Sequence, residues 1–361
     1  MLANASFIVK QPDSMRGDSP NLDLLRSLAV IFVVLSHLPP LGLIMEMYHY
    51  HLQSLGLLGV IIFFVHTCLV LMLSLERQTD TLGEQRRASL FFVRRAFRIY
   101  PLSVVVVLVV SVFAKGSGAE PTYSTILSNL LLIQNLNGEP SIPGALWSLP
   151  FEVQMYLVLP MLYLLVVRAG KTALWRVCLL WLGSIGVIFT LYRLGLNYHL
   201  LKYLPCFLPG VMAFTLRKTP RKVAPWALFL YVGSVAVIYP WAVAYGVKEN
   251  MLAWPVCLAL GLIIPWCREI DVSWLRSTGK VVARYSYGIY LVHGPCIDFA
   301  FNYLGGMPPL LQWGSFIAAT ATLSYLAYHW IEKPGIDLGG RLAKRWSRGI
   351  VTGLVTNQAI D

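Results

Sequence analysis

One apolar segment near the start of the chain carries three ionisable side chains. Asp23, Arg26 and His37 lie within residues 21–37, NLDLLRSLAVIFVVLSH. On a helix they share one narrow stripe, with His37 roughly 20 Å along the axis from Asp23. Ionisable groups inside a membrane helix are costly and usually face a cavity or a partner, and an imidazole can exchange a proton near neutral pH. The pattern predicts a proton-transfer site. A neutral histidine bonded to a neighbouring helix is the alternative.

The same segment predicts different environments for its three ionisable residues. Asp23 and Arg26 are i, i+3 neighbours, and we expect them to pair near the aqueous edge. His37 follows the run LAVIFVVLS, and we expect it about two-thirds of the way through the first span.

A cluster of arginines lies in residues 92–101, FVRRAFRIYP. On a helix Arg94 and Arg98 share a face, and Arg95 lies beside Arg98. Guanidinium groups bind phosphate through paired hydrogen bonds, so the cluster predicts a phosphate-bearing ligand at one membrane edge. Anchoring to anionic lipid is the alternative.

Glu152 lies within another apolar run, in residues 144–156, GALWSLPFEVQMY. A carboxylate there is costly unless it is paired or in water, so it predicts a role in orienting a hydroxylated substrate or assisting a histidine. A structural hydrogen bond to a neighbouring helix is the alternative.

Two further histidines lie in apolar runs. Ser286, Tyr290 and His293 fall on one face of RYSYGIYLVH, where His293 can line the same cavity as His37. We interpret His293 as structural rather than catalytic, and His66 as a core residue. The six cysteines lack the spacing of metal ligands and are interpreted as small buried hydrophobes, so no metal is expected.

The composition indicates a polytopic membrane protein. Of the 361 residues, 57% are hydrophobic and only 13% are charged, about half the charged fraction of a soluble domain. The net charge of +12 does not indicate nucleic-acid binding, because the basic residues lie between apolar runs, as in cytoplasmic loops.

We therefore predict an all-α membrane protein in which a polar tail (1–20) precedes a membrane domain (21–334) and a basic tail (335–361). About ten spans are expected, at 22–44, 55–75, 98–114, 144–167, 174–194, 199–216, 224–245, 251–267, 284–304 and 310–330. Basic residues gather in alternate loops, which predicts that both termini are cytoplasmic, in the inner membrane of a bacterium. The residues before Pro101 are expected to follow the inner surface.

Several stretches together resemble the membrane acyltransferase-3 family of integral-membrane O-acyltransferases. They occur in the family's order across nearly the whole chain: LDLLRSLAVIFVVLSH (22–37), GVIIFFV (59–65), RRAFRIYP (94–101), LWSLPFEVQMYLVLP (146–160), SYGIYLVH (286–293) and IEKP (331–334). Two positions depart from the family pattern, since Ile61 replaces a frequent acidic residue and Thr67-Cys68 replaces Ser-Gly.

The resemblance implies acyl transfer, most simply of acetyl, from cytoplasmic acyl-CoA to a hydroxyl of a carbohydrate on an envelope glycan or glycolipid. It also implies that His37 is essential and that the arginines serve the donor. Whether His37 acts as a general base or forms an acyl-histidine stays open. The expected catalytic residues are His37, Glu152 and Asp23, and the expected donor-binding residues are Arg26, Arg94, Arg95 and Arg98.

A proton-coupled transporter is the alternative function. Intramembrane Asp, Arg, Glu and His side chains also build such carriers. Against it, the sequence lacks paired halves with broken spans at matching positions.

Overall fold

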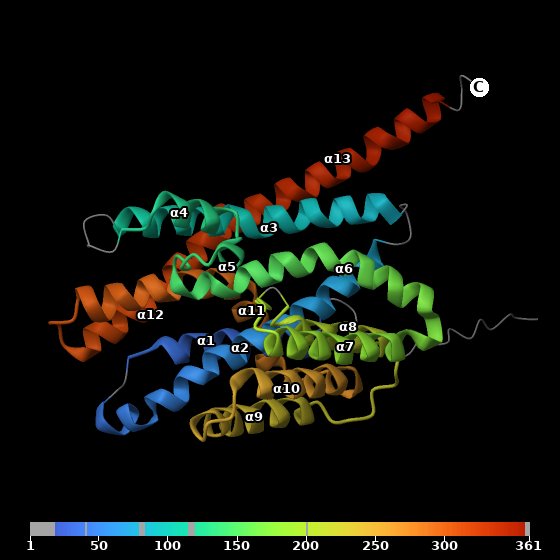
Figure 1. The fold of residues 1–361 in the computed structure, drawn as a ribbon. Helices are drawn as coiled ribbons and strands as arrows, with labels where there is room; N and C mark the ends of the chain where they lie inside the picture. Colours follow the sequence, from blue (N-terminus) through green and yellow to red (C-terminus); the bar gives the residue numbers. More distant parts are fainter. Residues whose placement is uncertain (1–18, 40–41, 79–83, 115–119, 200, 358–361) are drawn as a thin grey trace, which may run out of the picture.

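A computed structural model describes the backbone of residues 19–39, 42–78, 84–114, 120–199 and 201–357. The described residues form helices and no strand, which confirms the predicted all-α class. The helices, shown in Figure 1, are α1 (Pro20–His37), α2 (Gly42–Arg77), α3 (Glu84–Phe113), α4 (Tyr123–Leu130), α5 (Gln134–Asn137), α6 (Leu149–Ala169), α7 (Ala173–Arg193), α8 (Leu204–Thr215), α9 (Trp226–Ala244), α10 (Glu249–Ile263), α11 (Ser273–Ile297), α12 (Pro309–Ala327) and α13 (Lys333–Asn357).

Six helical segments of the described chain are long and apolar enough to cross a membrane. They are Pro20–His37, Leu52–Arg77, Arg87–Phe113, Gly144–Arg193, Trp226–Ala244 and Glu249–Trp266. The fourth contains both α6 and α7 and so covers two of the predicted spans. The predicted spans at 199–216, 284–304 and 310–330 correspond to α8, α11 and α12, which fall below these limits of length or hydropathy.

The first predicted span is too long at its C-terminal end. α1 ends at His37, and Leu38 is already extended, with ψ of 142°. Leu38 precedes Pro39 and Pro40, and a proline both lacks an N–H and disfavours helical backbone in the residue before it. His37 is therefore the last residue of its helix, and the prediction that it lies two-thirds of the way through a span is wrong.

The segment before Pro101 does not form a separate surface piece. α3 is one continuous helix from Glu84 to Phe113 that contains Pro101. Neighbouring helices can compensate for a proline within a membrane helix, and α13 approaches closely enough that a Cβ on Gly335 would lie 2.7 Å from the Phe97 carbonyl oxygen. The arginines at 94–98 thus lie within α3, and the predicted span boundary at residue 98 is wrong.

α2 is packed on several sides, against α1, α6, α8, α9 and α10. A Cβ on Gly59 of α2 would lie 2.5 Å from the carbonyl oxygen of Ala29 in α1, and one on Gly210 of α8 would lie 2.4 Å from that of Val65 in α2. Glycine at such positions lets helix backbones approach closely. These contacts fix α1 and α8 on α2, whose side chains line much of the site.

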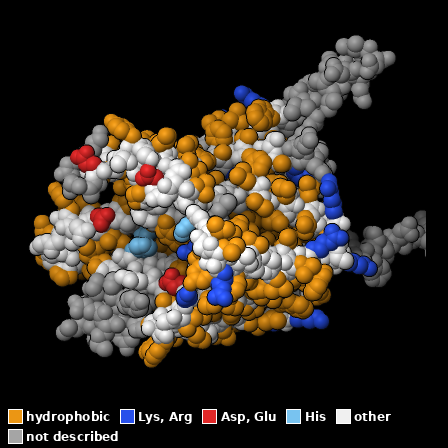
Figure 2. Space-filling view, in the orientation of Figure 1, with side chains coloured by type: hydrophobic (Ala, Val, Ile, Leu, Met, Phe, Trp, Pro, Cys, Tyr) orange, Lys and Arg blue, Asp and Glu red, His pale blue; other side chains and the backbone are white. Residues whose placement is uncertain are grey.

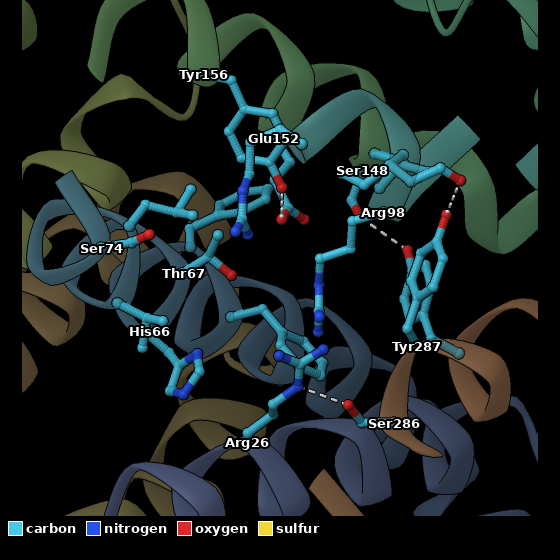
Figure 3. A pocket seen from close by; sticks show the side chains of 18 of the residues that line it. Arg26, His66, Thr67, Ser74, Arg98, Ser148, Glu152, Tyr156, Ser286 and Tyr287 are labelled. Atoms are coloured by element: carbon cyan, nitrogen blue, oxygen red, sulfur yellow. Dashed lines mark hydrogen bonds between the residues drawn. The ribbon is translucent and has the colours of Figure 1, made fainter. Parts of the chain in front are cut away.

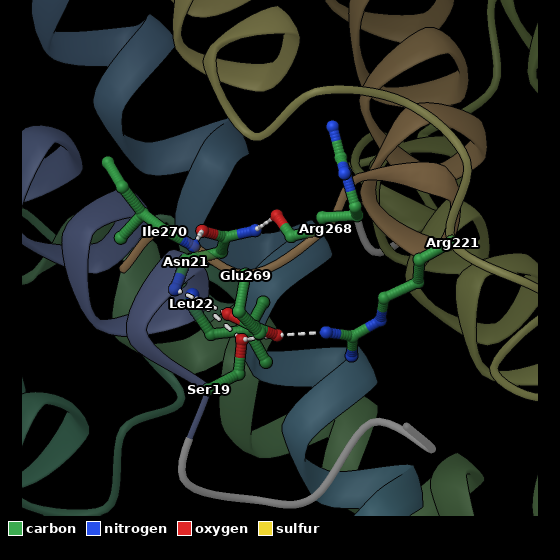
Figure 4. A network of polar contacts seen from close by, with 7 residues as sticks. All are labelled: Ser19, Asn21, Leu22, Arg221, Arg268, Glu269 and Ile270. Carbon is green, nitrogen blue, oxygen red and sulfur yellow. Dashed lines mark hydrogen bonds and ion pairs between the residues drawn. The ribbon is translucent and has the colours of Figure 1, made fainter. Parts of the chain in front are cut away.

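α1 and α11 lie side by side, and a polar clamp joins the start of α1 to the segment just before α11 (Figure 4). The Glu269 carboxylate accepts hydrogen bonds from Ser19 Oγ (2.6 Å) and the Asn21 backbone N–H (3.0 Å), and pairs with Arg221 at 2.5 Å. The Asn21 side chain bonds the backbone of Arg268 and Ile270 at 2.8 and 3.0 Å. The clamp satisfies orphan N–H groups at the first turn of α1 and sets its register against α11.

The residues after α12 extend the helical bundle. A π-helical segment, Tyr328–Glu332, joins α12 to α13, and the first turns of α13 pack along α3 (Figure 1). A Cβ on Gly339 would lie 2.6 Å from Phe97 Cβ, so this packing requires small residues. The predicted tail is therefore helical over residues 335–357, and its first turns pack against the rest of the bundle. The domain boundaries stay predictions.

Candidate functional site

Two cavities lie between the helices, and the predicted site residues divide between them. One, of about 210 Å³, we call the arginine cavity because Arg26, Arg95 and Arg98 line it. The other, of about 480 Å³, we call the histidine cavity because it contains His37. The arginine cavity reaches the Arg77 end of α2, and the histidine cavity lies along the earlier part of α2, from Gln53 to Val60, where α1 finishes.

The arginine cavity gathers cations from three helices. Arg26 comes from α1, Arg77 from α2, and Arg95 and Arg98 from α3. Figure 3 labels Arg26 and Arg98. Arg26 Nε donates to Ser286 Oγ at 2.6 Å, and the buried Nε of Arg95 has no hydrogen-bond partner among the described residues. Like charges held together in a low-dielectric space repel one another, so the arrangement favours an anionic ligand.

Glu152 is the only carboxylate among the described residues that line the arginine cavity. It lies in the first turn of α6 and accepts a hydrogen bond from Tyr156, one turn later. Figure 3 shows the pair on the α6 side of the cavity, with Arg26 on the α1 side. Glu152 therefore shares a cavity with the arginines, while His37 lines the other one, so the two residues are not brought together as a base and its assistant.

Among the described residues, His37 forms hydrogen bonds through only one of its ring nitrogens. Its Nδ1 lies 2.8 Å from the Val33 carbonyl oxygen and 3.1 Å from Ser36 Oγ, whose own proton is donated to Val33 at 2.7 Å. A carbonyl oxygen can only accept, so in neutral His37 the proton lies on Nδ1 and the lone pair on Nε2. The side chain is exposed at the cavity. Nε2 is thus available to take a proton from a bound hydroxyl.

His293 packs against His37, but it does not line the histidine cavity as the sequence analysis expected. The ring centroids are 5.0 Å apart, with the planes inclined at 69°. His293 is fully buried, its Nδ1 lies 3.2 Å from the Ile289 carbonyl oxygen, and its Nε2 has no hydrogen-bond partner among the described residues. The contact places a second imidazole beside the candidate base.

An ordered segment between α3 and α6 delivers side chains to both cavities. Ser124 and Thr125 donate to Glu139 at 2.6 and 2.7 Å, and these hydrogen bonds lower the pKa of that carboxyl group. The chain then enters the short helical turn Gly144–Ser148. Ala145 and Trp147 line the histidine cavity, and Ser148 lines the arginine cavity.

Two predicted site residues line neither cavity. Asp23 precedes Arg26 by nearly one turn, and Arg94 is next to Arg95, but neither side chain belongs to a cavity lining. Conversely, His66, interpreted as core, is buried and lines the arginine cavity. Within the described chain, no three His, Cys, Asp or Glu side chains gather as a metal site would require.

Sequence reasoning missed several polar or aromatic lining residues. The place of Tyr156 beside Glu152 could have been predicted, because it lies four residues after Glu152 and so on the same helix face. No sequence pattern indicated Gln53 or Glu249, because they come together only through the packing of α2 and α10.

These features define an all-helical protein with several membrane-length apolar helices and two cavities between the helices. The chain belongs to the acyltransferase-3 family, whose model, described as an acyltransferase domain, matches residues 19–329. The resemblance inferred from the motifs is thereby confirmed, and the fold is that of an integral membrane protein.

Two kinds of relative are similar to this chain. Acyltransferase MdmB of Streptomyces mycarofaciens is 28% identical over 309 residues, which cover 77% of this chain and 78% of that protein. Putative O-acetyltransferases of several Staphylococcus aureus strains are 22% identical over 87% of this chain, which spans 57% of their length. No solved structure matches the chain.

Proposed function

We propose that the protein transfers an acyl group, most simply acetyl, from acyl-CoA to a carbohydrate hydroxyl on an envelope glycan or glycolipid. One observation carries the proposal. A cavity lined by arginines, three of them partly buried, lies next to a cavity that holds an imidazole whose Nε2 has no hydrogen-bond partner among the described residues, and both lie in an acyltransferase-family domain.

The arginine cavity suits the donor. Coenzyme A carries several phosphate groups, and arginine binds phosphate through charge-assisted, paired hydrogen bonds. In this proposal Arg95 and Arg98 hold the phosphates, and Arg26, oriented by Ser286, faces the acyl end. Arg94 was expected to join them, but only its neighbours line the cavity.

The histidine cavity suits the acceptor. Gln53 and Glu249 offer hydrogen-bonding groups, and Trp147 offers an apolar face. As the acceptor oxygen attacks the thioester carbonyl, its proton passes to His37 Nε2, the carbon–sulfur bond breaks, and the thiolate of CoA leaves and is protonated. A transient acyl-histidine, formed by His37 Nε2 and released by the acceptor, is the covalent alternative.

We further propose ten spans with both termini in the cytoplasm of a bacterium and the donor on that side. Figure 2 supports a bilayer around the middle of the molecule, because hydrophobic side chains cover it between mainly basic side chains at one end and acidic ones at the other. Reporter fusions at residue 85 and at the C-terminus should read cytoplasmic, and one at residue 118 should read external. An external signal at residue 85 would reverse the orientation.

A proton-coupled transporter is the second candidate, and one observation favours it. Cavities on both sides of a helical bundle also suit a carrier, which opens a central site to one face at a time. The two functions differ in their need for a sealed compartment, since transfer chemistry proceeds in solution and transport does not.

The test is an assay of the purified protein in detergent. With acetyl-CoA labelled in the acetyl group and a glycan extract of the cell envelope, we expect label to pass to carbohydrate, as measured by mass spectrometry of the released sugars. A mixture without protein gives the background. Acetyl-CoA binding without transfer in detergent, together with solute uptake into sealed vesicles, would favour the transporter instead.

A further inference from the structure

Among the residues that the structure describes, Tyr290 is the only one that lines both cavities. We propose that its side chain is the partition between them, which keeps solvent in the histidine cavity away from the donor in the arginine cavity. The role in protecting the donor rests on the proposed function, whereas the partition itself does not. Tyr290 would then be a positioning residue: it would keep solvent away from the donor and would not itself take part in making or breaking bonds.

Hydrogen bonds hold the Tyr290 hydroxyl to both sides of the boundary. It donates to the carbonyl oxygen of Ala145, which lines the histidine cavity. Ser148, which lines the arginine cavity, lies 2.8 Å away through its Oγ. Since the single phenolic proton goes to the carbonyl, the Ser148 hydroxyl donates to the Tyr290 oxygen. Figure 3 shows the Ser148 end of this arrangement.

Aromatic contacts hold the ring itself. Tyr290 is 7% exposed. Its centroid lies 6.3 Å from Phe63, which lines the arginine cavity, and 6.1 Å from His293. His293 in turn contacts His37 at 5.0 Å. Phe63, Tyr290, His293 and His37 therefore form a row of rings from one cavity to the other, with Tyr290 in the middle.

A partition has a chemical purpose at this position. A thioester hydrolyses if water reaches its carbonyl in place of the acceptor, and enzymes suppress such side reactions by excluding water from the site. A continuous aqueous passage between the two cavities of a membrane protein would also leak solutes. One tyrosine, tied to both linings, prevents both as long as no acceptor occupies the boundary.

Thiol labelling tests the partition without any ligand. Thr67 lines the arginine cavity from α2, and Figure 3 shows its side chain there. In sealed proteoliposomes, a charged, membrane-impermeant thiol reagent is added to the face of the histidine cavity, and labelling of T67C is compared with the parent that has only its native cysteines. We expect the T67C thiol to be protected, and to react at least about tenfold faster when Tyr290→Ala is added. Reagent added to the other face should label T67C in both proteins, which also verifies that each is folded.

Two matched variants separate loss of the partition from general loosening. Tyr290→Phe keeps the ring, so T67C should stay protected. Tyr287→Ala removes an equal ring from the same helix, but Tyr287 lines only the arginine cavity, so protection should persist. Equal labelling with and without Tyr290→Ala, or exposure in Tyr287→Ala as well, would overturn the proposal.

A second measurement links the partition to the donor. Without acceptor, release of CoA from acetyl-CoA should rise at least about tenfold in Tyr290→Ala, or in the milder Tyr290→Leu if the alanine variant does not fold. Unchanged release with acetyl-CoA bound would overturn the protective role. If the unmodified protein binds no acetyl-CoA while the labelling result holds, the proposed function fails and the partition stands.

Discussion

Replacing His37 by alanine is expected to abolish most of the acyl transfer while leaving acyl-CoA binding near normal. The loss should be at least about 10²- to 10⁴-fold in turnover, as is typical when a general base is removed. Binding should persist because His37 lines the histidine cavity, whereas the arginines that suit the donor line the other one. Turnover of purified protein with saturating acetyl-CoA, together with donor binding by calorimetry, would measure the two effects separately.

A matched control for this substitution is His199→Ala. His199 is an exposed histidine that lines neither cavity, so its removal should leave turnover near that of the unmodified protein. Asp23→Asn should cost less than His37→Ala, because Asp23 lies outside both linings. Wild-type turnover in purified His37→Ala would make the histidine structural, and Glu152 or His293 would become the candidate base.

Replacing Arg98 by alanine is expected to weaken the donor complex strongly. Each lost charge-assisted hydrogen bond to a phosphate should cost about 1.5–3 kcal/mol, or roughly a 10- to 100-fold rise in Kd for acyl-CoA. Arg95→Ala should act in the same direction, since both side chains line the cavity. Lysine at either position should restore only part of the affinity, because an ammonium cannot reproduce the planar fork of the guanidinium.

Arg94→Ala provides the comparison on the same helix. Its side chain lines neither cavity, so its loss should raise the Kd for acyl-CoA by much less than the loss of Arg98. Affinity that is unchanged in Arg95→Ala and Arg98→Ala, or reduced equally in all three variants, would reassign the cluster to lipid anchoring. Circular dichroism and size-exclusion profiles would confirm that each variant keeps its helical fold.

Much of this arrangement could be predicted from residue spacing. The apolar runs predicted an all-helical membrane protein, and the three-residue spacing of Arg95 and Arg98 placed both on one side of α3. The four-residue spacing of Glu152 and Tyr156 carried similar information. Such predictions succeed because a helix fixes the relative directions of its own side chains, whatever surrounds it.

Other features depend on how helices meet, which spacing does not determine. Arg26 and His37 share a stripe on α1, but eleven residues separate them by about 16 Å, too far for one small cavity. The closeness of His37 and His293, and the place of Tyr290 between the cavities, depend on the lateral packing of α1, α2 and α11. The early end of α1 was signalled by Pro39 and Pro40, and it was missed because apolar residues continue beyond them.

The contacts between α1 and α11 bear on what crosses the membrane. The Glu269 clamp joins the start of α1 to the segment just before α11. Further along, Ser27 bonds Gly279 at 3.0 Å and Arg26 bonds Ser286, and at the end of α1 His37 contacts His293. A pair secured along its whole length resists the rocking by which a carrier exposes a substrate to alternate faces. In the proposed reaction, then, neither the coenzyme nor the sugar needs to change sides: only the small acyl fragment is handed across, and the remainder of each substrate stays where it bound.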